Sequence, residues 1–443
     1  MSNPATTHFT ESFDAIGTEL PGASLGWLDG ARREALAQFE TLGFPTQRDE
    51  DWKYTNVRAI ERGAFNLGAD TEHNLSSLAD LSLPTLAGPR LVFINGTFSE
   101  ALSNAPDTVG VSALSASSQL TSAPDTMHDW ADLNAKSTNG FVALNRAFAT
   151  DGTMLRIASG TTVSEPIHLV HVSVSGAEGA AAPATHYRSV IVAEAGAQVE
   201  VVESFVSIGD KPGLINSATR IVVESDAKVS HSMIQNLGLS AYHVGRYDVH
   251  VSQGGNFISD STSLGARLAR YDIDVVFAGA ESVCTLNGLY VARGRQHVDY
   301  HTRVDHVAPN CTSDEYYKGI LDGHGRGVFN GRVYVHQDAQ KSDASQANHN
   351  LLLSDNAEID TKPQLEIYAD DVTASHGATV GQLDDDMLYY LRTRGLDEAN
   401  ARGLLTFGFA QEAIGRMRHA GIREHITREL NTALPALASI MTD

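Results

Sequence analysis

Corners rich in Gly, Asp and Asn recur through the middle of this chain and constrain its fold more than any other feature. Between them lie short apolar or β-branched runs with almost no helical period. The corners are Gly196-Ala197-Gln198-Val199, Asp226-Ala227-Lys228-Val229, Gly254-Gly255-Asn256-Phe257 and Gly279-Ala280-Glu281, separated by 30, 28 and 25 residues. This imperfect repeat predicts stacked β coils, in which each coil buries its inward side chains against its neighbours. A β-sandwich is the competing interpretation, although it ordinarily uses fewer strands.

The β pattern fills only the centre of the chain, so we predict three regions. Residues 1–150 form a mixed, mainly helical domain, residues 151–383 an all-β core, which the resemblance described below makes a β-helix, and residues 384–443 a helical domain. Helices at both termini can cover the ends of such a stack. An exposed strand edge that remains can pair with a β coil of another chain.

Local signals place several elements in the N-terminal region. Apolar residues at helical spacing predict a helix over Gly26–Leu42, closed by Gly43. Asn95-Gly96 within Leu91–Phe98 predicts a hairpin with a type I′ turn. Residues 68–88 and 104–128, rich in Ser, Ala, Asp and Thr, are expected to form loops or short irregular pieces.

The junction of the β and C-terminal helical regions is the most informative local stretch. Alternation puts His376 on one face of an extended segment with small or apolar neighbours: Val372, Ala374, Ala378 and Val380. The run Asp384–Asp386 then opens a helix, where the helix dipole favours negative charge. Met387, Leu388 and Leu391 give this helix an apolar face, and Gly395 ends it. Asp397 caps a second helix, whose apolar stripe is Leu404, Leu405, Ala413, Ile414 and Met417.

Composition excludes several functional classes. A net charge of −22 argues against a nucleic-acid partner, because phosphates would repel such a surface. No run reaches the roughly 18 apolar residues that span a bilayer, and the N-terminus lacks the pattern of a secretory signal, so we expect a cytoplasmic protein without a membrane partner. The chain has two cysteines, Cys284 and Cys311, whereas an iron–sulfur cluster held by one chain needs about four ligands.

Five segments carry a resemblance to a known family. They are KPQLEIYADDV (Lys362–Val372), SHGATVG (Ser375–Gly381), YYLRTRG (Tyr389–Gly395), RDEDWKYTNV (Arg48–Val57) and HVDYHTRVDH (His297–His306). Together they resemble the SufB/SufD family, scaffold proteins of iron–sulfur cluster assembly. The RDEDWKYTNV segment is similar to the SufD branch rather than the SufB branch.

The resemblance implies a right-handed parallel β-helix, flanked by an N-terminal mixed or helical region and C-terminal helices. It further implies a scaffold that is not an enzyme, pairs with SufB through the β-helix and docks the ATPase SufC through C-terminal helices. His376 then becomes a candidate ligand for a transient iron ion or iron–sulfur cluster at the SufB interface, with no permanently bound cofactor. This chain has Ala374 where SufD proteins often carry a cysteine, so the loop offers no thiolate.

Other interpretations of these residues stay open. His376 is either a buried histidine satisfied by a backbone carbonyl or a ligand aimed at a partner, and the resemblance favours the ligand. The row His297, Asp299, His301, Arg303 and Asp305 is either a metal site or, as we favour, a solvated ladder of paired charges. Cys284 and Cys311 are expected to be core residues. His324, His336 and His349 add little, and no Walker A loop is present.

Two alternative functions remain. A β-helix carbohydrate enzyme would use clustered Asp, Lys or Arg on an open groove, but such enzymes are usually exported. The SufB relative is the other alternative, although SufB usually has cysteines in its N-terminal part and this chain has none before Cys284. The sequence leaves open whether the isolated chain is a monomer or a homodimer.

Overall fold

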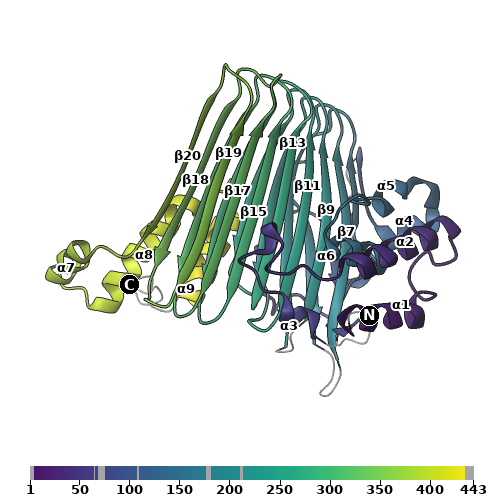
Figure 1. Ribbon diagram of the computed structural model, residues 1–443, viewed down its shortest axis with the longest axis horizontal. Coiled ribbons are helices and arrows are strands. Elements are labelled where there is room, and N and C mark those ends of the chain that lie inside the picture. The colour runs from purple at the N-terminus through teal and green to yellow at the C-terminus, as the bar shows by residue number, and fades with distance from the viewer. Residues whose placement is uncertain are drawn as a thin grey trace.

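The computed structural model describes residues 4–63, 65–67, 75–106, 109–175, 181–209 and 213–434. Two long sheets form a parallel β-solenoid with helices at both ends (Figure 1). The mainly β fold with flanking helical regions is therefore confirmed. Among the described residues, no helix has the length and apolar character that crossing a membrane requires.

The N-terminal region mixes helices with short strands. Its elements are α1 (Pro4–Ile16), α2 (Gly26–Leu42), η1 (Glu50–Trp52), α3 (Arg58–Glu61), β1 (Phe65–Asn66), β2 (Arg90–Ile94), β3 (Thr97–Phe98), η2 (Glu100–Leu102), β4 (Val111–Ser115), α4 (Ala116–Ser122), η3 (Pro124–Thr126), α5 (His128–Ala131) and α6 (Gly140–Phe148). The predicted helix over Gly26–Leu42 is confirmed. So is the hairpin, in which Asn95 and Gly96 both have positive φ between β2 and β3.

The expectation of loops over residues 104–128 is wrong in part. Strand β4 pairs antiparallel with β5, and Ser115 caps helix α4 by accepting from the Ser118 amide. A polar strand that pairs at a sheet end needs little apolar patterning, so its composition resembled a loop. Of the other predicted loop, residues 68–74 lie outside the described residues.

The solenoid alternates strands between two sheets. Its strands are β5 (Thr153–Ile157), β6 (Ile167–Val174), β7 (Ala182–Ala193), β8 (Gln198–Ile208), β9 (Leu214–Val223), β10 (Lys228–Asn236), β11 (Tyr242–Val251), β12 (Asn256–Ser263), β13 (Leu268–Phe277), β14 (Val283–Ala292), β15 (His297–His306), β16 (Thr312–Leu321), β17 (Arg326–Val335), β18 (Asp343–Leu352), β19 (Glu358–Ile367) and β20 (Thr373–Gly381). One sheet runs from β4 and β5 through the odd strands to β19, and the other from β3 and β2 through the even strands to β20.

The predicted corners hold the coils in register. Gly196, Asp226, Gly254 and Glu281 all adopt positive φ, the left-handed conformation that a sharp corner needs. Each corner also donates its amide to a carbonyl of the next coil, as Gly196 does to Ser225 and Asp226 does to Gln253. Equivalent residues therefore stack on one another along the solenoid. The space between the two sheets, here called the lumen, is filled by the largest buried cluster of the described residues.

The C-terminal helices are α7 (Asp385–Thr393), α8 (Glu398–Ile414) and α9 (Ala420–Ala433). Both predicted caps are confirmed, since the side chains of Asp384 and Asp397 accept from amides of the first turns. In Figure 1, α8 and α9 lie against the solenoid, whereas α7 projects beyond its end.

Candidate functional site at the open end of the solenoid

His376 lies on β20, the last strand of its sheet. This strand pairs with β18 on one side, and the described residues place no strand on its other edge. The side chain is exposed, so the interpretation as a buried histidine is wrong. Its neighbours were small enough for burial, but burial also needs a following coil, and the chain turns into helix α7 instead.

The face that carries His376 points toward the lumen side of the sheet. Its residues stand in register above fully buried residues of β18: Ala374 above Ala344, His376 above Gln346, Ala378 above Asn348 and Val380 above Asn350. Side chains at matched positions of parallel neighbours share a face. The predicted common face of β20 is thus confirmed, and it forms the uncovered last layer of the lumen.

A buried acid lies two strands below His376. Glu315 of β16 is in register with Gln346 of β18, which is in register with His376. Thr302 donates to Glu315 Oε2 at 2.5 Å, and Gln346 Nε2 donates to Oε1 at 3.2 Å. Burial raises the pKa of the Glu315 carboxyl to about 7. Glu315 and Gln346 were not among the residues predicted from the sequence. They could have been identified because they occupy the same position as His376 in the two preceding coils of this sheet.

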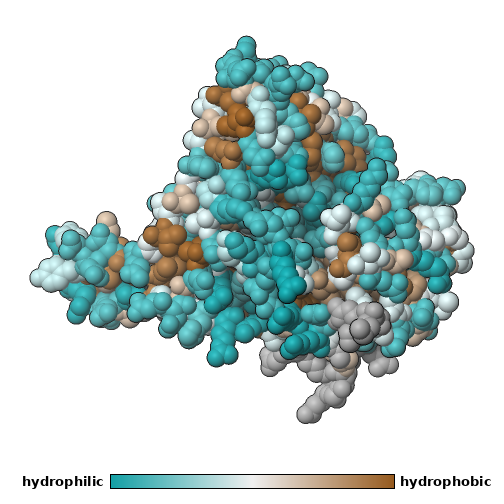
Figure 2. Space-filling model, viewed as in Figure 1, coloured by the Kyte–Doolittle hydropathy of each residue, from teal (hydrophilic) through white to brown (hydrophobic). Residues whose placement is uncertain are grey.

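Helix α7 presents apolar surface beside this end. Met387, Tyr389 and Tyr390 are 57%, 71% and 56% exposed, and α7 has no buried residue. Of the predicted apolar face, Met387 is exposed and Leu388 and Leu391 are only partly buried. None of the three belongs to a buried core cluster of the described residues. Figure 2 shows apolar surface between this helix and the end of the solenoid.

Helix α8 is anchored to the solenoid along its length. Ala413, Ile414 and Met417 of the predicted stripe are buried, whereas Leu404 is 36% exposed and Leu405 is only partly buried. The side chain of Lys318 on β16 is 3% exposed; it forms an ion pair with Glu412 and donates to the Phe409 carbonyl at 3.1 Å. In the N-terminal half, Ala401 and Thr406 are buried and Arg402 donates to the Leu353 carbonyl at 3.0 Å, so both halves of α8 are attached to the solenoid.

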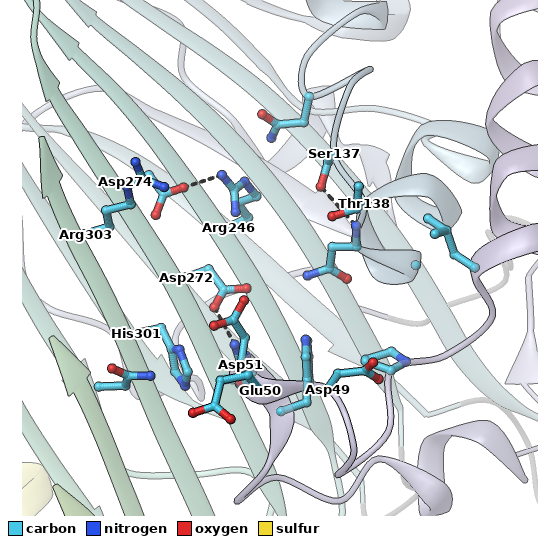
Figure 3. Close-up of a pocket in the computed structure, with 18 of the residues that line it drawn as sticks. Asp49, Glu50, Asp51, Ser137, Thr138, Arg246, Asp272, Asp274, His301 and Arg303 are labelled. Carbon is cyan, nitrogen blue, oxygen red and sulfur yellow. Dashed lines mark hydrogen bonds and ion pairs between the residues drawn. The ribbon is translucent and has the colours of Figure 1, made fainter. Parts of the chain in front are cut away.

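His301 and Arg303 of the His297–His306 row line a polar pocket of about 1120 Å³ between the N-terminal segment and the outer face of the odd-numbered sheet (Figure 3). Asp299 is buried, and its carboxylate pairs with Arg270 at 2.8 Å and His301 at 3.1 Å. Burial alone would raise the pKa of Asp299, but Arg270 and His301 hold it well below its usual value. Thr55 also donates to Asp299, at 2.5 Å.

The row is thus a ladder of paired charges, as favoured, but it is partly buried rather than solvated. The pairs continue across neighbouring strands, where Arg246 contacts Asp248 at 2.8 Å and Asp274 at 2.5 Å. The acids and bases that line the pocket largely satisfy one another. No group of three or more His, Cys, Asp or Glu side chains suited to a metal ion occurs in the part of the chain that is described.

Cys284 and Cys311 are buried free thiols, as expected of core residues. Burial raises the pKa of the Cys284 thiol well above its usual value, and burial also raises that of Cys311. Neither sulfur lies on β20. The structure brings these cysteines together with neither His376 nor the histidines of the ladder.

Comparisons with known proteins match almost the whole chain. The model for the SufBD protein N-terminal region matches residues 3–169, and the model for the SufBD core domain of the SUF system for FeS cluster assembly matches residues 174–409. The iron–sulfur cluster assembly protein SufD of Escherichia coli K12 is 31% identical over 91% of this chain and 92% of its own length.

Two further relatives extend the likeness across kingdoms. The chloroplastic protein ABCI7 of Arabidopsis thaliana is 27% identical over 96% of this chain and 90% of its own length. The iron–sulfur cluster assembly protein SufD of Bacillus subtilis is 26% identical over 64% of each chain. The two family models and the relative from Escherichia coli show that this chain belongs to the SufB/SufD family of iron–sulfur cluster assembly proteins.

Proposed function

We propose that this chain is a non-enzymatic scaffold subunit of a cytoplasmic SufBCD complex, with the role of SufD. It would pair with SufB through the open end of the β-helix and dock the ATPase SufC through its C-terminal helices. The carbohydrate-enzyme alternative loses its basis, because the family acts in iron–sulfur cluster assembly. Relatives named SufD in two bacteria favour SufD over SufB.

The unpaired end of the solenoid supports the pairing with SufB. Strands β19 and β20 end the two sheets, and both carry mainly partly or fully exposed residues. Their backbone groups can pair with a strand of another chain, which continues a sheet across the interface. A partner of the same family would present coils of the same spacing.

The exposed imidazole of His376 carries the chemical part of the proposal. A neutral imidazole is a good ligand for iron, and this one stands on the edge that a partner would cover. One histidine cannot hold a cluster alone, so the remaining ligands would come from SufB. An iron ion or cluster would therefore be cargo of the interface and stay only transiently.

The projecting helix supports the docking of SufC. Exposed Met387, Tyr389 and Tyr390 give this helix an apolar and aromatic surface, and such residues are common in protein interfaces. Helix α8 joins α7 to the solenoid, through the Lys318–Glu412 pair among other contacts. A movement of SufC would thus be transmitted to the same end of the molecule that presents His376.

Co-expression with SufB and SufC tests the proposal. The His376→Ala variant should co-purify with both partners but form clusters at least tenfold more slowly on reconstitution. Ser375→Ala, a change on the opposite face of the same strand, is the matched control and should assemble clusters normally. Normal cluster formation by His376→Ala would remove the ligand role, and failure of the unmodified chain to bind SufB would remove the scaffold role.

A further inference from the structure

Glu315, Gln346 and His376 form a column on three successive strands of one sheet. They occupy matched positions on β16, β18 and β20. Neighbouring strands lie about 4.8 Å apart, and matched side chains share a face. The amide of Gln346 therefore stands between a buried carboxyl below and the exposed imidazole above.

The hydrogen bonds of Gln346 are incomplete. Its Nε2 donates to Glu315 Oε1 at 3.2 Å, whereas its Oε1 is buried and has no partner among the described residues. A buried acceptor left unpaired is destabilising, so this position favours a nearby hydrogen-bond donor. Nε2 and Oε1 are bonded to the same amide carbon and point in different directions. Since Nε2 binds Glu315 of β16, Oε1 remains available to a donor on β20.

Glu315 explains why the amide adopts this orientation. The carboxyl is fully buried and already accepts from Thr302 at 2.5 Å. While it is ionised, its second oxygen accepts from Gln346 Nε2, and a flipped amide would set two acceptors against each other. Glu315 thus fixes which atom of Gln346 is left for the last strand.

We propose that Gln346 Oε1 accepts a hydrogen bond from one ring N–H of His376, and so makes Gln346 and Glu315 positioning residues for this histidine. The bond fixes the imidazole tautomer and leaves the lone pair of the other ring nitrogen directed to the uncovered side. Partners of this kind orient metal-binding histidines and set their tautomer. The inference rests on the proposed role of His376 as a ligand, which it deepens.

The tautomer of His376 can be measured on the full isolated chain. With ring-labelled histidine, nitrogen and carbon NMR shifts above pH 8 report which ring nitrogen carries the proton, and His376→Gln assigns the signal. We expect about a fivefold excess of one tautomer at His376, as a hydrogen bond of ordinary net strength gives. Exposed His324 of the same chain is the internal reference. A His376 with the same ratio as His324 would overturn the proposal without any variant.

The substitution Gln346→Met keeps the side-chain volume and removes the acceptor. Gln346→Met should bring the tautomer ratio of His376 to that of His324. Ser345→Ala, on the other face of β18, should leave the tautomer ratio of His376 unchanged. An unchanged ratio in folded Gln346→Met would also refute the proposal. This readout needs neither SufB nor iron. A tautomer shift in Gln346→Met together with normal cluster assembly by His376→Ala would support the positioning of His376 but reject its role as a ligand. An unchanged tautomer ratio in Gln346→Met together with slow cluster assembly by His376→Ala would reject the positioning and support the ligand role.

Discussion

The indole ring of Trp52 lies over the guanidinium of Arg270, with 3.8 Å between the ring centroid and the guanidinium carbon. Arg270 is buried and pairs with Asp272 and Asp299, so the indole closes the ionic ladder from the outside. Trp52 belongs to the RDEDWKYTNV segment. This contact joins the N-terminal region to the middle of the solenoid, more than 200 residues away in sequence.

Replacing Trp52 should therefore destabilise the whole chain. Trp52→Ala is expected to lower the free energy of unfolding by about 3–5 kcal/mol, because it removes a buried aromatic side chain and opens the ladder to water. The midpoint of urea denaturation measures the loss. Tyr54→Ala, in the same segment at 36% exposure, should cost about 1 kcal/mol or less. Equal losses of unfolding free energy in the two variants would show that Trp52 does not shield the ladder from water.

A buried histidine in the lumen should make stability fall in mild acid. Burial lowers the pKa of His243 to about 3, whereas an unfolded histidine titrates near 6.5. The unfolded chain therefore takes up this proton first, and stability is lost as the pH falls below about 6.5 toward 3. Between pH 7 and 5 this histidine should cost about 2 kcal/mol. In His243→Gln the urea midpoint should change less over that interval, and an identical pH dependence would contradict the prediction.

The Lys318–Glu412 pair should hold α8 to the solenoid. Lys318→Met keeps the apolar stem but loses the charged hydrogen bonds, at a cost of about 2 kcal/mol. Amide hydrogen exchange should accelerate about tenfold or more over Glu398–Ile414 while staying unchanged in the distant helix α2. Arg326→Gln, which breaks an exposed pair with Glu358, should alter neither helix. Unchanged exchange in α8 would mean that apolar packing alone anchors it.

The two thiols should be unreactive in the native chain. Cys284 and Cys311 are 1% and 0% exposed, and burial raises the pKa of both, which lowers the thiolate fraction. A thiol-specific chromogenic reagent at pH 8 should modify both only on the timescale of unfolding, and rapidly in denaturant. Fast reaction of either thiol in native protein would show that the lumen opens.

The sequence predicted the regular parts of this structure because they depend on local chemistry. The corners at Gly196 and Asp226 require residues that tolerate positive φ, and such residues stand out in a β region. The caps Asp384 and Asp397 are equally local, since each bonds to amides within its own helix turn. These features could be read without knowing what lies beside them in space.

Other features depend on neighbours that the sequence does not name. His376 is exposed because no further coil lies above β20 within the described residues, and small flanking residues fit a buried strand equally well. Arg270 and Asp299 are 29 residues apart, and only the register of β13 and β15 brings them together. Gln346 gave no signal of its own, because its role depends on the strands to either side.

The residue-for-residue register between coils has a further consequence. Since each layer repeats the last without offset, the span from the N-terminal helices to the edge that presents His376 grows in steps of about 4.8 Å per coil. Gain or loss of one whole layer would change that span, and it would also disturb contacts that the N-terminal segment makes across the layers, Trp52 with Arg270 and Glu50 with Lys362. The length of the solenoid is therefore tied to the segment that lies along it.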